Sequence, residues 1–142
     1  SPHLAAELAG LEIDLKRITD AYAKIRTQYN PDVLLLESAG GIYVPLNQRQ
    51  IMADIPAALG IPAVIVADAA LGTINHTVLT INELRRRDVE VRGVIVNRVP
   101  EDPGILIRDN LKMIEKFGKV EIIAQAGTGK GFIDDLGLRH IF

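Results

Sequence analysis

The spacing of apolar residues over residues 11–29 is that of an amphipathic helix. Apolar side chains recur every three or four positions, at Leu11, Leu15, Ile18, Tyr22, Ile25 and Tyr29, which places them on one face of a helix. An Asn-Pro-Asp sequence at residues 30–32 then breaks this pattern. Residues 33–37 follow as a short apolar run that ends at Glu37. Such a run is typical of a parallel strand buried on both faces.

The same alternation of helix and strand continues along the chain. We expect helices at residues 48–59, 75–87 and 104–117, and buried strands at residues 63–67, 91–96 and 120–123. Short connections between alternating helices and strands favour right-handed crossovers and a parallel sheet. The sequence therefore predicts a single α/β domain over residues 1–142, with a doubly wound, mostly parallel sheet.

Composition and charge exclude several classes of protein. The net charge of −2 gives no electrostatic basis for binding nucleic acid, and no apolar run is long enough to cross a membrane. Cysteine is absent, which excludes disulfides and thiolate metal sites and is compatible with the cytoplasm. We therefore expect a cytoplasmic protein that binds neither nucleic acid nor membrane.

The candidate chemistry lies just after each predicted strand, because ligands of open parallel sheets bind at the carboxyl ends of the strands. The first strand is followed by Glu37, Ser38, Ala39, Gly40 and Gly41. A carboxylate in this position can hold Mg²⁺ directly or through water, and small residues let the backbone approach a phosphate closely. The alternative is that Glu37 only caps a turn and the glycines only form the bend.

The second strand is followed by a candidate anion site. Gly72 and Thr73 precede a predicted helix whose first N–H groups are free to attract a phosphate or carboxylate. Asn75 and His76 could add side-chain donors. The alternative is that Thr73 or Asn75 is an ordinary N-cap and that His76 is a solvated surface residue. Asp68 is interpreted as a turn residue.

The third strand is followed by Asn97 and Arg98. An asparagine at the end of a strand offers one acceptor and two donors to a flat heterocycle such as adenine. An Asx turn before the nearby proline is an equally good interpretation of the same residues.

The sequence GTGKGF at residues 127–132 has some features of a phosphate loop. The Walker pattern, however, requires a glycine where this chain has Ala124 and a serine or threonine where it has Gly131. We interpret this segment as a loop without a phosphate role. The sequence thus predicts a nucleotide-binding type of sheet that has no phosphate loop of its own.

Three segments, in this order and spacing, resemble the dethiobiotin synthetase family. They are LLLESAGGIYVPL at residues 34–46, VADAALGTINHTVLT at residues 66–80 and VRGVIVNRVPED at residues 91–102. The GTINHT run is specific to the family, whereas the ESAGG run resembles related synthetase and amidotransferase domains more widely. The resemblance covers residues 1 to about 120 and implies a P-loop NTPase-like fold. It also implies that the P-loop strand and helix are absent from this chain, which would form the C-terminal two-thirds of the domain.

The resemblance implies an activity and a set of site residues. The family forms dethiobiotin from 7,8-diaminononanoate and CO2 in biotin biosynthesis, uses ATP and Mg²⁺, and is generally a homodimer. By similarity Glu37 is the metal-associated residue, and the nucleotide side consists of Glu37, Ser38, Ala39, Gly40, Asn97 and Arg98, with Asn97 on the adenine. The substrate carboxylate, which comes from the partner subunit, would meet Gly72, Thr73 and Asn75. No catalytic residue is assigned in this chain.

Two departures from the family pattern concern the nucleotide side. Ser38 stands where family members usually have glycine, and no proline stands near Ala124, where the family has one beside the adenine. In the family, the P-loop strand would lie beside the strand that ends at Glu37. Because the missing P-loop positions and neutralises the phosphates, we expect the chain alone to be inactive. It would need a missing N-terminal segment or a complementary chain. The alternative is a non-catalytic relative that binds a nucleotide or a partner and regulates another function.

Overall fold

The computed structural model describes residues 1–128 and contains two compact units, which divide between Ile61 and Pro62. No helix among residues 1–128 combines the length and the apolar character needed to span a membrane.

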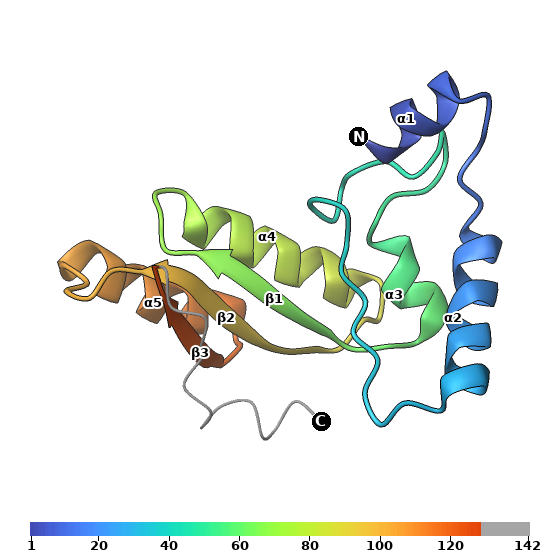
Figure 1. Cartoon of the computed structure of the whole chain (residues 1–142). Coiled ribbons are helices and arrows are strands. Elements are labelled where there is room, and N and C mark those ends of the chain that lie inside the picture. The colour runs from blue at the N-terminus through green and yellow to red at the C-terminus, as the bar shows by residue number, and fades with distance from the viewer. Residues whose placement is uncertain (129–142) are drawn as a thin grey trace. The chain divides into compact units, whose positions relative to one another are not determined.

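The second unit contains a three-stranded parallel sheet in the order β1-β2-β3 (Figure 1). Its strands are β1 (Ala63–Asp68), β2 (Val91–Val99) and β3 (Ile122–Gly127). Helix α4 (Thr73–Arg86) connects β1 to β2, and α5 (Ile105–Gly118) connects β2 to β3. Helix α4 packs on β1 and β2 and also against α5. This arrangement confirms the predicted α/β class with parallel strands.

The core of the second unit is aliphatic, as the composition requires. Its most deeply buried side chains are those of Ile81, Val94, Val96 and Ile114. Helices α4 and α5 can approach closely because position 118 has no side chain, since a Cβ at Gly118 would lie 2.7 Å from Ile81 Cδ1. Arg85 fixes the same contact by donating to the Gly118 and Lys119 carbonyls, at 2.6 and 2.8 Å. These bonds satisfy carbonyls that a helix end leaves free.

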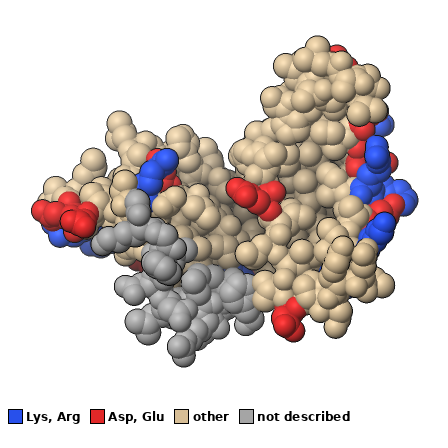
Figure 2. Space-filling view, viewed as in Figure 1, with Lys and Arg blue, Asp and Glu red and all other residues tan. Residues whose placement is uncertain are grey.

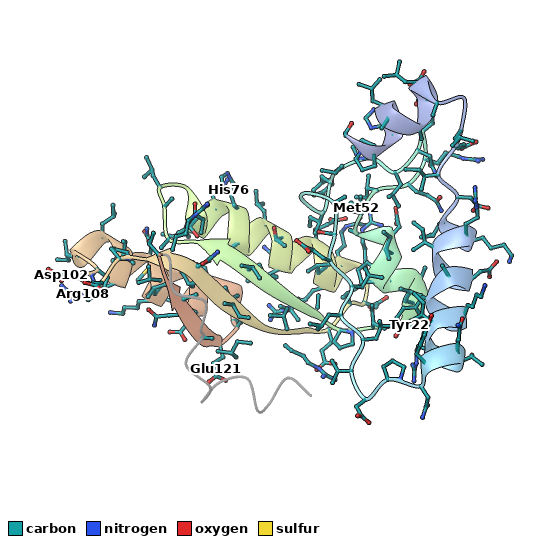
Figure 3. The ribbon with its side chains drawn as sticks, viewed as in Figure 1. Tyr22, Met52, His76, Asp102, Arg108 and Glu121 are labelled. Carbon is teal, nitrogen blue, oxygen red and sulfur yellow. The ribbon has the colours of Figure 1, made fainter. Side chains whose placement is uncertain are left out.

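The first unit is helical, with α1 (Pro2–Leu8), α2 (Leu15–Tyr29) and α3 (Asp54–Leu59). Its core cluster contains Leu46, Met52 and Ile55, against which Ile13, Leu15, Ile18, Val44 and Leu59 pack. Met52 is labelled in Figure 3, close to α3. Figure 2 shows charged side chains gathered along the outer side of α2, where Lys16 and Asp20 form an ion pair at 2.6 Å. This is the polar face expected for an amphipathic helix.

Two helices of the first unit are shorter than predicted. Helix α2 begins after Asp14, whose side chain accepts a hydrogen bond from Lys16 N at 2.9 Å and so caps the helix four residues later than expected. Residues 48–53 are not helical: Asn47 Oδ1 accepts from Arg49 N and Gln50 N, at 2.8 and 2.9 Å, and Ile51 forms an isolated antiparallel bridge with Pro45. Only α3 remains of the helix predicted there. Helix α1 was not predicted.

The predicted strand at residues 33–37 is wrong. These residues have no regular structure, and the side chain of Leu35 is 80% exposed. A strand is stable only when a neighbouring strand accepts and donates its backbone hydrogen bonds. Within residues 1–128 no strand pairs with residues 33–37. Residues 33–37 therefore have the composition of a buried strand, but the described residues provide no neighbouring strand to form its backbone hydrogen bonds.

Candidate functional site

The register of the sheet brings the ends of β1 and β2 together. Asp68 lies opposite Asn97, and Ala69 N donates to the Asn97 carbonyl at 3.0 Å. The sequence predicted Asn97 as the last residue of this strand. Strand β2 in fact continues to Val99, so Arg98 also belongs to the strand. The two predicted nucleotide-side residues thus lie next to Asp68.

Asp68 and Arg98 form a bidentate ion pair across these strand ends. Arg98 Nε donates to Asp68 Oδ1 at 2.8 Å, and Arg98 Nη2 donates to Asp68 Oδ2 at 2.5 Å. The hydrogen bonds from the guanidinium lower the pKa of the Asp68 carboxyl below its usual value. Sequence reasoning treated Asp68 as a turn residue and missed this pair. The partners are 30 positions apart, and only the register of β1 against β2 joins them.

The side chain of Asn97 has a fixed orientation. Its Oδ1 accepts a hydrogen bond from Arg98 N at 2.8 Å. A backbone N–H can only donate, so the oxygen of the carboxamide and not the nitrogen must face it. Among residues 1–128, Asn97 Nδ2 has no acceptor. Asn97 therefore presents a hydrogen-bond donor to whatever binds at this end of the sheet.

The start of α4 has the properties of an anion site. Gly72 is the N-cap, with a φ of 90°, and no side chain caps the helix, so the interpretation of Thr73 or Asn75 as the N-cap is wrong. The N–H groups of the first turn have no acceptor within the helix, although Thr73 N donates to the Ala70 carbonyl in the preceding turn at 3.2 Å. Thr73 is only 5% exposed, and its Oγ1 is buried without a hydrogen-bond partner in the described part of the chain. Asn75 is exposed at the same helix start.

A depression of about 350 Å³ lies between α4 and the edge strand β1. Helix α4 contributes Thr73, His76, Thr77 and Thr80 to its lining. His76 lies close to the beginning of α4 (Figure 3) and is exposed, as the surface interpretation expected. Its Cε1 would lie 3.3 Å from a Cβ at Gly72, so the imidazole closes over the backbone of that glycine. The depression combines an apolar strand with hydroxyl groups from one helix face.

Glu37 and its small neighbours lie in the first unit. Ser38 Oγ donates to the Gly40 carbonyl at 2.8 Å, and Gly40 has a φ of 94°, a conformation that favours glycine. Glu37 is exposed on the irregular segment before this turn. No group of three His, Asp or Glu side chains that could hold a metal ion occurs in the described residues. A single carboxylate still fits Mg²⁺, which keeps several waters and takes its remaining ligands from substrate phosphates.

The predicted sites fall into two sets that the structure describes separately. Glu37, Ser38, Ala39 and Gly40 belong to the first unit, whereas Gly72, Thr73, Asn75, Asn97 and Arg98 belong to the second. Residues 129–132 of the GTGKGF segment lie outside the described residues.

Comparison with known proteins gives a consistent family. A family model described as an AAA domain matches residues 1–126, and it is P-loop NTPase-like, as the sequence predicted. The ATP-dependent dethiobiotin synthetase BioD of Brachyspira hyodysenteriae is 40% identical, over 100% of this chain and 65% of that protein. The corresponding protein of Methanococcus vannielii is 36% identical, over 96% of this chain and 64% of its own length. The chain thus spans slightly less than two-thirds of the length of these relatives.

Proposed function

The chain belongs to the dethiobiotin synthetase family, and we propose that it supplies the C-terminal two-thirds of an ATP- and Mg²⁺-dependent dethiobiotin synthetase. The reaction converts 7,8-diaminononanoate, CO2 and ATP into dethiobiotin, ADP and phosphate, in biotin biosynthesis. The observation that carries the proposal is the start of α4 within the family-specific GTINHT run. There the Thr73 hydroxyl is buried without a hydrogen-bond partner in the described residues, and no side chain caps the helix.

The start of α4 binds the carboxylate of the diamine substrate in this proposal. Free N–H groups and the positive end of the helix dipole favour an anion. The Thr73 hydroxyl, which has no hydrogen-bond partner within residues 1–128, adds a donor to the carboxylate. Exposed Asn75 can contribute a further donor from its carboxamide. The diamine lies at the interface of a homodimer, so the carboxylate belongs to substrate held by the partner subunit.

The nucleotide lies at the ends of the strands. Asn97 donates through Nδ2 to a ring nitrogen of the adenine, and Arg98 lies beside it. Glu37 is the Mg²⁺-associated carboxylate, and Ser38, Ala39 and Gly40 allow the phosphates to approach the backbone. When bound, Mg²⁺ supplies charge neutralisation to the transferring phosphoryl group. The proposal includes a cytoplasmic location, with which the absence of cysteine is compatible.

The chain needs a further segment for activity. Most of the catalysis of phosphoryl transfer comes from positioning and neutralising the phosphates, and no phosphate loop occurs within residues 1–128. Strand β1 has the apolar sequence of a central strand, yet it pairs only with β2 in the described residues, and Val66 is 65% exposed. An additional strand carrying the phosphate loop, from an N-terminal segment or a complementary chain, would cover this edge. The chain alone would be inactive.

The metal assignment is tested in the chain combined with a segment that carries the phosphate loop. Glu37→Gln should abolish dethiobiotin formation, measured by mass spectrometry, and should weaken the Mg²⁺ dependence of ATP binding. Glu7→Gln, an exposed glutamate on α1, is the matched control and should retain activity. Product formation that is unaffected by Glu37→Gln contradicts the metal assignment. Nucleotide binding without any product would instead favour the non-catalytic, regulatory relative.

A further inference from the structure

The imidazole of His76 turns its two nitrogen atoms towards the start of α4. Beyond the adjacent residues, the atoms nearest to the position of a Cβ at Gly72 are Cε1, Nδ1 and Nε2 of His76, at 3.3, 3.8 and 3.9 Å. Because Cε1 lies between the two nitrogens, the ring approaches the N-cap residue with its polar edge. Side chains of a helix point back over the preceding turn, and the glycine at position 72 leaves room for the ring there.

His76 and Thr73 line the same depression beside β1, which has a volume of about 350 Å³. The two residues are three positions apart on α4, so their side chains are neighbours on the surface of the helix. Thr73 is 5% exposed, and its Oγ1 has no hydrogen-bond partner among residues 1–128. Within the same residues, neither ring nitrogen of His76 forms a hydrogen bond. Two neighbouring side chains thus have unused hydrogen-bonding groups at the helix-start end of the depression.

The backbone offers further donors at the same place. His76 N closes the first turn of α4 by donating to the Gly72 carbonyl at 3.1 Å. The N–H groups of Ile74 and Asn75, which precede it in that turn, have no acceptor in the part of the chain that the structure describes. Two backbone donors, a buried hydroxyl and the polar edge of an imidazole therefore surround the positive end of the helix dipole. This combination of groups suits a carboxylate.

We propose that His76 is a further substrate-binding residue, which donates a ring N–H to the carboxylate held by Thr73 and the first turn of α4. The inference rests on the proposed function, in which this helix start receives the carboxylate of 7,8-diaminononanoate. A neutral imidazole has one N–H and a protonated imidazole has two, so the ring can donate in either state. His76 thereby helps the site to distinguish the free acid from an uncharged ester of the same carbon chain.

The test compares 7,8-diaminononanoate with its methyl ester, in the chain combined with the phosphate-loop segment. His76→Ala removes one hydrogen bond to a charged group and should raise the KM for the acid roughly tenfold, while the KM for ATP stays the same. The KM for the ester should not change, because the ester has no carboxylate for His76 to bind. Alanine favours the helix, so the variant should keep α4. Asn82→Ala, at another exposed polar residue of α4, is the control and should leave all three constants unchanged.

The outcomes separate this inference from the proposed function. If the unsubstituted protein does not distinguish the acid from the ester, the carboxylate site is overturned and the inference with it. If the preference for the acid is as large in His76→Ala as in the unsubstituted protein, the role of His76 is overturned and the carboxylate site at Thr73 stands. A second measurement needs no turnover, because the ¹⁵N NMR signals of the His76 ring should shift when the acid binds and respond less to the ester. Ring signals that do not respond to the bound acid also overturn the inference.

Discussion

The buried hydroxyl of Thr73 gives a sharp prediction, in which one substitution stabilises the fold and weakens the site. Thr73 is 5% exposed, and its Oγ1 has no hydrogen-bond partner in the described residues. Leaving such a group unsatisfied costs about 1–3 kcal/mol. Valine has nearly the same shape, leaves no cavity and has a similar helix propensity. Thr73→Val should therefore raise the free energy of unfolding by about 1 kcal/mol, the low end of that range, and the thermal midpoint by about 3 °C.

The same substitution should weaken binding of the diamine. A hydrogen bond to a charged group contributes about 1.5–3 kcal/mol, so its loss should raise the KM for 7,8-diaminononanoate at least roughly tenfold. The KM for ATP should stay the same. Differential scanning calorimetry of the chain and steady-state kinetics of the combined enzyme measure the two effects separately.

Thr80→Val is the matched control on the same helix. Thr80 Oγ1 donates to the His76 carbonyl at 2.8 Å, so valine removes a hydrogen bond there and should give no gain in stability. Both threonines line the depression beside β1. A destabilising Thr73→Val would refute the reasoning, because it would mean that the Thr73 hydroxyl already has a partner in the folded chain.

Two further predictions concern the second unit. Gly118→Ala should lower the free energy of unfolding by about 1–3 kcal/mol, because its Cβ would lie 2.7 Å from Ile81 Cδ1. Ile81→Val removes that methyl group, so denaturant unfolding should show that the double variant is more stable than the sum of the two single effects predicts. Strict additivity of the two effects would contradict this packing. The Asp68 carboxyl should titrate by NMR below its usual pKa and return towards it in Arg98→Gln. Because the pKa of Asp68 is lower in the folded chain than in the unfolded chain, the ion pair stabilises the fold at pH values above the unfolded pKa of about 3.9. This stabilisation is lost as the pH falls through the folded pKa of Asp68. An unshifted titration midpoint of Asp68 in the native chain would exclude the ion pair in solution.

In the second unit the sequence predicted the type and order of the elements from local signals, but β3 covers Ile122–Gly127 instead of residues 120–123, and β2 extends to Val99. Strand β1 is a continuous apolar run, and α5 carries apolar residues at helical spacing that end at Gly118. In the first unit, the periodicity correctly predicted most of α2 but not its first residue. That residue is set by the Asp14 side chain, whose capping bond overrides the apolar residue at Leu11.

Two of the failures depend on a partner that is distant in the sequence. Residues 33–37 have the composition of a strand, but composition cannot show whether a neighbouring strand is present. The Asp68–Arg98 pair follows from the register of two strands, which joins residues 30 positions apart. The Gly72, Thr73 and Asn75 cluster could be predicted because all of its members lie at the start of one helix.

The most direct test of the account measures dethiobiotin formation by the chain with and without a segment that carries the phosphate loop. Both reactions contain ATP, Mg²⁺, bicarbonate and 7,8-diaminononanoate, and the product is detected by mass spectrometry. We predict no dethiobiotin from the chain alone and ATP-dependent dethiobiotin from the combination, lost again with Glu37→Gln. Dethiobiotin from the isolated chain, or none from a combination that binds ATP and diamine, would contradict the account.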